Sequence, residues 1–381
     1  MALLIKNARV FAPKDLGVTD VLMGAGQVLA VGRDLTSSLP NTETIDAKGM
    51  IMTPGFFDQH IHVTGGGGEG GPATRTPELM LSELIACGTT SVVGVSGTDY
   101  VTRSIPNLLA KVRALKTEGV SAWMYTSNYH VPPTLLTDSI ADDLFFVPEV
   151  LGVKIALGDH RSSFPTLETV LSMLTDIRVG GMIAGKTGFL HVHTGNIPGP
   201  FDMYREIVKR GFPIKHIRPT HCARIRHVFD AAVEFAKAGG WIDITTGASC
   251  CFDHPAQAIV EALDAGVDPT HLTFSTDGHG SVPRFNDKGE MVGLGVGGVD
   301  ANLRETKRLI TEYSMPIEKA LTFTTSNVGA ALGLKGQGVI EEGGCGNCCL
   351  FTDELELSYV VSKGRVMMRE GNIEVKGTFE Y

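Results

Sequence analysis

The sequence predicts an α/β fold: a (β/α)8 TIM-like barrel with a small β-sandwich domain built from both chain termini. Three observations predict it. Between residues 54 and 336, apolar segments of strand length alternate with amphipathic segments of helix length, which is typical of βα units around a parallel sheet. The flanking segments instead have the short alternating pattern of strands. The 381 residues also accommodate one barrel of about 250 residues and one minor domain.

Both ends of the chain have the pattern of a small sheet. Alternating apolar runs separated by Gly, Pro, Asn and Asp occur at 3–11, 18–31 and 44–52, and similar runs return at 349–351, 357–362, 365–368 and 373–376. We therefore predict one small β domain from residues 1–53 and 337–381, and the barrel from residues 54–336.

Eight strands alternate with helices in the predicted barrel. We expect the strands at 56–63, 90–97, 121–129, 150–157, 189–194, 217–221, 241–246 and 272–277. We expect helices, several of them ending at glycine, at 76–87, 104–118, 165–178, 200–210, 227–238, 254–265, 301–313 and 316–332.

A doubly wound open sheet is the alternative fold. Its first strand is usually followed by a glycine-rich phosphate turn, and the run Gly65 to Gly68 does follow the first predicted strand here. However, the run lacks the GxGxxG spacing into a helix and comes after two histidines, so we favour the barrel.

Composition narrows the function classes. Hydrophobic residues make up 43% and charged residues 20% of the chain, as expected for a globular protein with a large core. The net charge of −9 argues against nucleic acid as a partner, because nucleic-acid binding needs a basic face. A small or peptide-like substrate fits better.

Location and redox state are also expectations from sequence. The N-terminus lacks the pattern of a secretory signal and no apolar run is long enough to span a bilayer, so we expect a cytoplasmic protein that has no membrane partner. The seven cysteines, including Cys250-Cys251 and the cluster Cys345, Cys348 and Cys349, lack zinc-finger spacing and are expected to be reduced thiols.

The pair His60 and His62 is the first candidate site. Residues two apart on a strand project from the same face, so the two imidazoles point together and can form half of a zinc site. Alone, the pair favours two ordinary half-buried histidines over a metal site.

Catalytic groups of a barrel lie at the carboxyl ends of its strands, so the other strand ends test this pair. They bear Lys154 near the end of the fourth strand, His193 after the fifth, His221 after the sixth and Asp277 after the eighth. Such imidazoles and carboxylates suit two divalent cations, zinc first. A buried lysine can lower its pKa and react as a neutral amine with carbon dioxide, giving a carbamate that can bridge two metals.

The same positions resemble the binuclear amidohydrolase superfamily. Within it, the strings HIHVTGGGGE at 60–69, YHVP at 129–132, GVK at 152–154, DHRS at 159–162, PTHCAR at 219–224 and STDGHGS at 275–281 resemble the isoaspartyl (β-aspartyl) dipeptidases over almost the whole chain. Three segments depart from the family pattern. Residues 343–349 are rich in cysteine where an acidic segment is usual, His279 stands between Asp277 and Ser281, and the segment from Cys250 to His254 is unusual.

The resemblance implies a metal site and a mechanism. One zinc would be held by His60, His62 and Asp277 and a second by His193 and His221, with carboxylated Lys154 and a hydroxide as bridges. Asp277 would act as general base and then acid, and Tyr129 would donate a hydrogen bond to the tetrahedral oxyanion. His160 and His191 are expected to be supporting or structural residues rather than ligands.

The resemblance also implies how a dipeptide would be recognised. Glu69 would pair with the substrate ammonium, and Arg161 and Arg224 with its carboxylates. Gly67, Thr98 and Ser281 would complete the binding site. It further implies a homo-oligomer, with an octamer as one possible size. The alternatives are another amidohydrolase, such as a hydantoinase, a dihydroorotase or a dipeptidase of different specificity, and a non-catalytic scaffold, which the six converging ligands disfavour.

Overall fold

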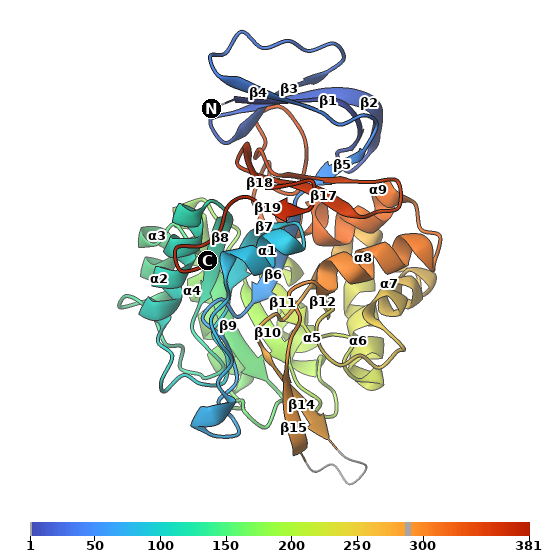
Figure 1. The fold of residues 1–381 in the computed structure, drawn as a ribbon. Helices are drawn as coiled ribbons and strands as arrows, with labels where there is room; N and C mark the ends of the chain where they lie inside the picture. Colours follow the sequence, from blue (N-terminus) through green and yellow to red (C-terminus); the bar gives the residue numbers. More distant parts are fainter. Residues whose placement is uncertain (1, 286–290) are drawn as a thin grey trace.

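A curled set of eight parallel strands forms the centre of the molecule (Figure 1). The structure, a computed structural model, describes residues 2–285 and 291–381. Six strands pair in sequence order and two form a second parallel pair: β6 (Phe56–Ile61), β7 (Thr89–Gly94), β8 (Ser121–Thr126), β9 (Val150–Leu157), β10 (Leu190–Thr194) and β11 (Ile217–Thr220), then β12 (Ile242–Thr245) and β13 (Leu272–Ser275). Each of the eight predicted strands is present, with ends that differ by up to three residues.

The two parallel sheets meet at both of their edges. β12 lies beside β11, and β13 lies beside β6. At the second junction the Asp277 amide donates to the His60 carbonyl at 3.0 Å, and the His62 amide donates to the Gly278 carbonyl at 2.9 Å. These hydrogen bonds bring the ends of the first and last parallel strands together.

Burial explains why these segments are strands. Every residue of β6, β7, β9 and β10 is buried, because parallel strands are covered on both faces and form near-continuous apolar runs. The polar side chains in them, such as Asp58 and His60 of β6, are therefore buried as well. Lys154 is one of the largest fully buried side chains in the described chain.

Seven helices connect the parallel strands: α1 (Leu81–Ala86), α2 (Ile105–Glu118), α3 (Ile140–Phe146), α4 (Leu167–Ala184), α5 (Asp202–Lys209), α6 (Arg226–Lys237) and α7 (Pro255–Asp264). The helix α8 (Ala301–Thr311) follows the last of these strands. Three short 3-10 helices accompany them: η1 (Pro72–Thr74), η2 (Ile214–His216) and η3 (Pro269–His271). Local signals set several ends: the Ser104 side chain accepts from the Asn107 amide at the start of α2, and α4 ends at Gly185 in the left-handed conformation.

The helix prediction differs from the structure in four places. The helix expected at 165–178 extends to Ala184 as α4. The helix expected at 76–87 begins only at Leu81, because Thr76 is hydrogen-bonded to the glycine run through its amide to Gly66 O at 3.0 Å. The helix expected at 316–332 is divided into α9 (Ile317–Ala320), η4 (Leu321–Thr324) and α10 (Ser326–Leu332), with Thr325 at φ −135° and ψ −96° between the last two. The short α3 was not predicted.

Both termini contribute to one nine-stranded sheet, drawn at the top of Figure 1. β5 and β16 join its two halves by antiparallel pairing, with Pro54 opposite Cys348. Cys348 and Cys349 are buried in this sheet, and all seven cysteines are free thiols. Its strands are β1 (Ala2–Phe11), β2 (Asp15–Gly24), β3 (Gln27–Gly32), β4 (Thr42–Asp46), β5 (Ile51–Pro54), β16 (Cys348–Phe351), β17 (Leu357–Ser362), β18 (Arg365–Arg369) and β19 (Asn372–Ile373).

A hairpin that was not predicted follows the last parallel strand. β14 (Ser281–Phe285) pairs antiparallel with β15 (Met291–Val296) and projects away from the terminal sheet (Figure 1). It begins four residues after Asp277, so the hairpin lies beside the end of β13.

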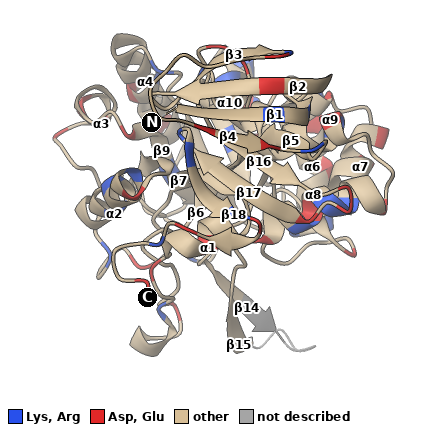
Figure 2. Ribbon diagram, turned by 45° about the horizontal axis from the view of Figure 1, so that its top comes forward, with Lys and Arg blue, Asp and Glu red and all other residues tan. Residues whose placement is uncertain are grey.

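Charges are mixed over the molecule. In Figure 2, Lys and Arg are interspersed with Asp and Glu, mainly on helices and loops. Among the residues that the structure describes, no helix combines the length and the apolar character that crossing a membrane requires.

Candidate active site

A cavity of about 580 Å3 opens at the carboxyl ends of the parallel strands. Most of the predicted site residues line it: His62, Gly67, Thr98, Tyr129, Arg161, His193, His221, Arg224, Asp277 and Ser281. The cavity is also lined by residues that were not predicted, among them Asp159, Asn196, Ile225, Val228 and Val282. The structure therefore gathers strand ends that are far apart in sequence at one site.

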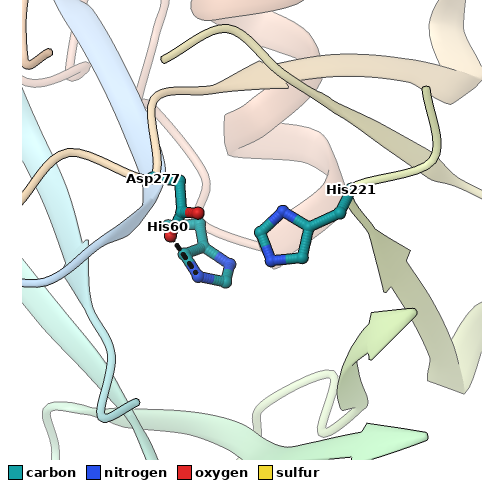
Figure 3. Close-up of side chains that lie close together, drawn as sticks. All are labelled: His60, His221 and Asp277. Carbon is teal, nitrogen blue, oxygen red and sulfur yellow. Dashed lines mark ion pairs between the residues drawn. The ribbon is translucent and has the colours of Figure 1, made fainter. Parts of the chain in front are cut away.

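Three buried side chains form the most compact group of possible metal ligands. His60, His221 and Asp277 each offer a ligand atom, and these atoms all lie within 4.8 Å of one another (Figure 3). The Asp277 carboxylate contacts His60 Nε2 at 3.3 Å and His62 Nε2 at 3.1 Å, both through Oδ1. His60 and His62 are fully or almost fully buried, so they are not the half-buried pair considered as the alternative.

Backbone conformation directs two of these ligands. His221 and Asp277 have φ values of 63° and 54°, in the left-handed region that few residues other than glycine adopt. Both residues follow directly after the ends of strands, where the chain turns. Such strained positions cluster at functional sites because the surrounding structure holds them in place.

Lys154 lies beneath the cavity. Its Nζ is 2.9 Å from His60 Nε2 and lies over the Tyr129 ring at 5.4 Å from the ring centre. Burial lowers the pKa of Lys154 to about 7, because a buried ammonium loses its hydration. A substantial fraction of the side chain is thus a neutral amine at neutral pH.

The histidines are held in the neutral form that binds metals. Burial lowers the pKa of His60, His62 and His221 below the usual value, and lowers the pKa of His193 to about 3. Burial would raise the pKa of Asp277, but the neighbouring histidines, first His221, hold it well below its usual range. The site therefore combines neutral imidazoles with an ionised carboxylate.

Two ring nitrogens in this group have no hydrogen-bond partner in the described part of the chain: His62 Nδ1 and His221 Nε2, both buried. The other ring nitrogen of His221, Nδ1, is hydrogen-bonded to the Thr245 hydroxyl at 2.6 Å. A metal-binding histidine is commonly held in orientation by such a hydrogen bond to its second nitrogen. A divalent cation beside Asp277 would satisfy His221 Nε2, so the residues fit a metal site. His62 turns its other nitrogen, Nε2, toward Asp277 at 3.1 Å.

His193 differs from the other predicted ligands. Its Nδ1 is 2.9 Å from the Tyr129 hydroxyl and its Nε2 is 3.0 Å from Asp159 Oδ2. Both of its ring nitrogens thus have side-chain partners, although its ring lies 4.6 Å from that of His221.

The predicted recognition residues Glu69, Arg161 and Arg224 all form ion pairs within the protein. Glu69 lies 3.4 Å from Arg161 Nη1 and accepts a hydrogen bond from the Ser281 hydroxyl. Arg224 Nη2 lies 2.6 Å from Asp277 Oδ2. Arg161 and Arg224 line the cavity, and Glu69 contacts two of its lining residues, Arg161 and Ser281.

The glycine run owes its composition to close packing. Gly65 and Gly67 have φ values of 77° and 75°, and a Cβ atom on them would lie 2.4 Å from Thr76 O and 2.3 Å from Thr74 O, respectively. The loop folds back on residues 74–77, which places Glu69 next to Arg161. The backbone of the glycine run is hydrogen-bonded to Thr74 and Thr76. This packing agrees with our preference for the barrel over a dinucleotide-binding sheet.

The two histidines predicted to be supporting residues have different surroundings. His191 is buried with Nε2 2.8 Å from His60 Nδ1, so it contacts a predicted ligand directly. The side chain of His160 is 76% exposed and only its Nδ1 approaches Asp159, at 3.3 Å. The unusual His279 bonds Glu83 at 2.9 Å and the Pro77 carbonyl at 2.9 Å, which anchors the loop after β13.

Asp159 is the main functional candidate that sequence reasoning missed. It lies two residues before Arg161 in the segment DHRS at 159–162. Only the fold brings it into contact with His193. The sequence did contain a signal for Asp159. An acidic residue two positions before a predicted substrate-binding arginine can form an ion pair with that arginine within the same loop.

Comparisons with known proteins agree with this geometry. Residues 51–367 match the model of the amidohydrolase family. The chain is similar to the crystal structure of β-aspartyl dipeptidase from the thermophilic, keratin-degrading Fervidobacterium islandicum AW-1 in complex with a β-Asp-Leu dipeptide, with 40% identity and a TM-score of 0.91 over 98% of this chain and 99% of that one.

Curated relatives are matched over smaller shares of their own length. A dihydroorotase of Staphylococcus epidermidis is 31% identical over 30% of this chain and 25% of its own length. Adenine deaminase 2 of Rhizobium etli is 25% identical over 94% of this chain and 54% of its own length. The chain thus spans about a quarter to about half of these relatives.

The family model covers most of the sequence, and the matched region contains all eight parallel strands and every predicted site residue. The chain therefore belongs to the amidohydrolase family.

Proposed function

We propose that this protein is a metal-dependent dipeptidase that hydrolyses isoaspartyl (β-aspartyl) dipeptides. The observation that carries the proposal is the convergence, at one cavity, of neutral histidines and Asp277 with Glu69, Arg161 and Arg224. The first group suits a hydrolytic metal centre, and the second matches the three charged ends of an isoaspartyl dipeptide. The full-length similarity to a β-aspartyl dipeptidase supports the same assignment.

The architecture that we propose follows from the two parallel sheets and the terminal sheet. We infer that the eight parallel strands close into a (β/α)8 barrel spanning residues 54–336. Residues 1–53 and 337–381 then form the small β domain, for which we retain the β-sandwich prediction. In this arrangement the site lies at the carboxyl ends of the barrel strands.

The metal centre would hold two zinc ions. We assign His60, His62 and Asp277 to one ion and His193 and His221 to the other, with Lys154 as a carboxylated bridge. The buried, partly neutral amine of Lys154 supports the last assignment. His193 would have to exchange one of its present partners for the ion. When bound, two such ions lower the pKa of water and polarise the scissile carbonyl.

The residues of the chain would perform the remaining chemistry. Asp277 accepts a proton from the attacking water and passes it to the leaving amine, so it acts first as a base and then as an acid. Tyr129 donates its hydroxyl proton in a hydrogen bond to the developing oxyanion. Burial raises the pKa of Tyr129, which keeps the hydroxyl protonated as this donor role requires.

Substrate recognition would depend on charge. Glu69 binds the ammonium group, while Arg161 and Arg224 bind carboxylates through paired hydrogen bonds. Gly67, Thr98 and Ser281 complete the binding site. An uncharged or cyclic substrate would leave these buried groups unpaired, which costs affinity.

A direct assay tests this proposal. The purified, zinc-loaded protein is expected to hydrolyse β-Asp-Leu and to leave α-Asp-Leu and dihydroorotate largely intact. Comparable turnover of the α-linked dipeptide would refute the substrate assignment. Preferred turnover of dihydroorotate would instead favour a cyclic amidase, the second candidate, which the similarity to dihydroorotase over part of the chain motivates.

Metal content separates both enzymes from a non-catalytic scaffold. We expect close to two zinc ions per chain after purification with zinc, and fewer than about one would favour the scaffold. We retain the prediction of a cytoplasmic location and infer a homo-oligomer from the resemblance to the dipeptidases. Light scattering can test whether the assembly contains eight copies.

A further inference from the structure

Asp159 occupies the junction between the predicted metal centre and the predicted substrate-binding residues. It follows β9, two residues after Leu157, and the intervening Gly158 has a φ of 70°. Its side chain is 12% exposed. At this position its carboxylate contacts side chains on two elements, Arg161 in its own loop and His193 on β10.

The contact with Arg161 is bidentate. Asp159 Oδ1 accepts from Arg161 Nε at 2.8 Å and Oδ2 accepts from Nη2 at 3.0 Å, while the Arg161 amide also donates to Oδ1 at 2.8 Å. Two parallel charge-assisted hydrogen bonds fix the plane of a guanidinium group as well as its position. They occupy Nε and Nη2 and leave Nη1 facing Glu69 at 3.4 Å.

The surroundings reinforce this placement. The guanidinium lies over the Tyr129 ring at 5.4 Å from the ring centre, and the Arg161 side chain is only 14% exposed. Asp159 Oδ2 also accepts from His193 Nε2 at 3.0 Å. One carboxylate thus fixes an arginine whose Nη1 contacts Glu69, and it also touches a histidine of the predicted metal site.

We propose that Asp159 is a positioning residue that holds the Arg161 guanidinium in place to receive a substrate carboxylate. The proposal rests on the proposed function and extends it to a residue that acts through Arg161. A long arginine side chain that is already held in its bound orientation loses less conformational freedom when the substrate binds. Loss of Asp159 is therefore expected to weaken substrate binding more than it slows the chemical step.

The kinetic test compares Asp159→Asn, Arg161→Met and the double variant. Asparagine keeps the shape of the side chain but removes its charge and one acceptor. For β-Asp-Leu we expect KM to rise about tenfold or more with kcat changed less than about threefold. If Asp159 acts through Arg161, the double variant is expected to be no worse than Arg161→Met alone.

Truncated substrates give a second kinetic signature. β-Alanyl-leucine lacks the α-carboxylate of the aspartyl residue, and the β-aspartyl amide of isopentylamine lacks the C-terminal carboxylate. One of these compounds lacks the carboxylate that Arg161 binds. For that compound, the kinetics of Asp159→Asn and of Arg161→Met are both expected to equal those of the wild type. Asp159→Glu is expected to recover part of the loss, because it restores the charge.

The matched control is Asp230→Asn. Asp230 pairs with Arg226 at 2.9 Å on the exposed surface of α6, so it undergoes the same chemical change outside the cavity. We expect its kinetics to equal those of the wild type. Additive losses in the double variant, or a different substrate pattern for Asp159→Asn and Arg161→Met, would overturn the proposal.

Two measurements do not depend on turnover. A crystal structure of zinc-loaded Asp159→Asn is expected to show the Arg161 guanidinium displaced from the Tyr129 ring, with the same zinc content as the wild type. A guanidinium group that stays in place in this variant, with or without a loss of zinc, would overturn the positioning role. This conclusion would hold even if the wild type proved inactive on β-Asp-Leu. Inactivity of the wild type alone would refute the proposed function, and the crystal structure would still decide the role of Asp159.

Discussion

Replacing Glu69 by glutamine tests the proposed recognition of the substrate ammonium. The change keeps the size of the side chain and removes its charge. Glu69 Oε1 accepts a hydrogen bond from Ser281, whereas Oε2 is buried and has no partner among the described residues. The Glu69 side chain is only 13% exposed, so solvent screens its interaction with an incoming cation weakly.

The expected loss follows from this environment. A hydrogen bond to a charged group contributes about 1.5–3 kcal/mol, and 1.4 kcal/mol corresponds to a tenfold change in an equilibrium or rate. We therefore expect kcat/KM for β-Asp-Leu to fall about 10-fold to 150-fold in Glu69→Gln. The nearby Arg161, 3.4 Å away, becomes less neutralised in the variant and should further disfavour a cationic group.

The assay compares two substrates that differ by one group. Succinyl-leucine has the carboxylates of β-Asp-Leu but lacks the amine, so its kcat/KM is expected to change little in Glu69→Gln. Glu78→Gln is the matched control, because Glu78 pairs with Lys111 and its side chain is 50% exposed. Equal losses on both substrates, or no loss on β-Asp-Leu, would refute the ammonium-binding role.

Three further predictions concern the metal centre and stability. Lys154→Ala is expected to lose turnover because no carbamate can form, and a short carboxylic acid such as propionate is expected to restore part of it; no restoration at any concentration would contradict the carbamate. Chelation is expected to abolish turnover and lower the thermal midpoint, since an ion at 1,000 times its Kd stabilises the folded state by about 4 kcal/mol; an unchanged midpoint would argue against a resident metal. Burial alone would raise the pKa of Glu149, but hydrogen bonds and charge from Arg113 and Lys116 lower it overall. Because a lowered pKa means that the unfolded chain binds more protons, Glu149→Gln is expected to cost up to about 1 kcal/mol at neutral pH, a small value since both cations are exposed. This difference in free energy of unfolding should vanish as the pH falls through the lowered pKa, below 4.5, and urea titrations that find it independent of pH would contradict the assignment.

The sequence predicted the parallel strands well because their signal is local. A strand buried on both faces is largely apolar, so β9 is visible as a near-continuous run, and β6 begins with two phenylalanines. The candidate site followed from the same segments, since the carboxyl ends of parallel strands lie at one edge. Residues such as His60 and His221 could thus be grouped before their distances were known.

Local patterns failed where tertiary contacts decide the structure. The helix expected from residue 76 starts late because Thr76 binds the glycine run, and the segment 316–332 is broken at Thr325. The strand β15 contains Gly293 and Gly295, and glycines in a strand interior give a weak strand signal.

The sequence alone determined which chemical groups this protein has and at which strand ends they stand. Only the tertiary structure decided which of them touch, because those contacts join residues distant in the chain: His60 with Lys154 at 2.9 Å, Glu69 with Arg161 at 3.4 Å, and Asp159 with His193 at 3.0 Å. Residue spacing fixes the face of a strand from which a side chain projects. It cannot fix the partner across the cavity, since that depends on how the loops after several strands pack against one another.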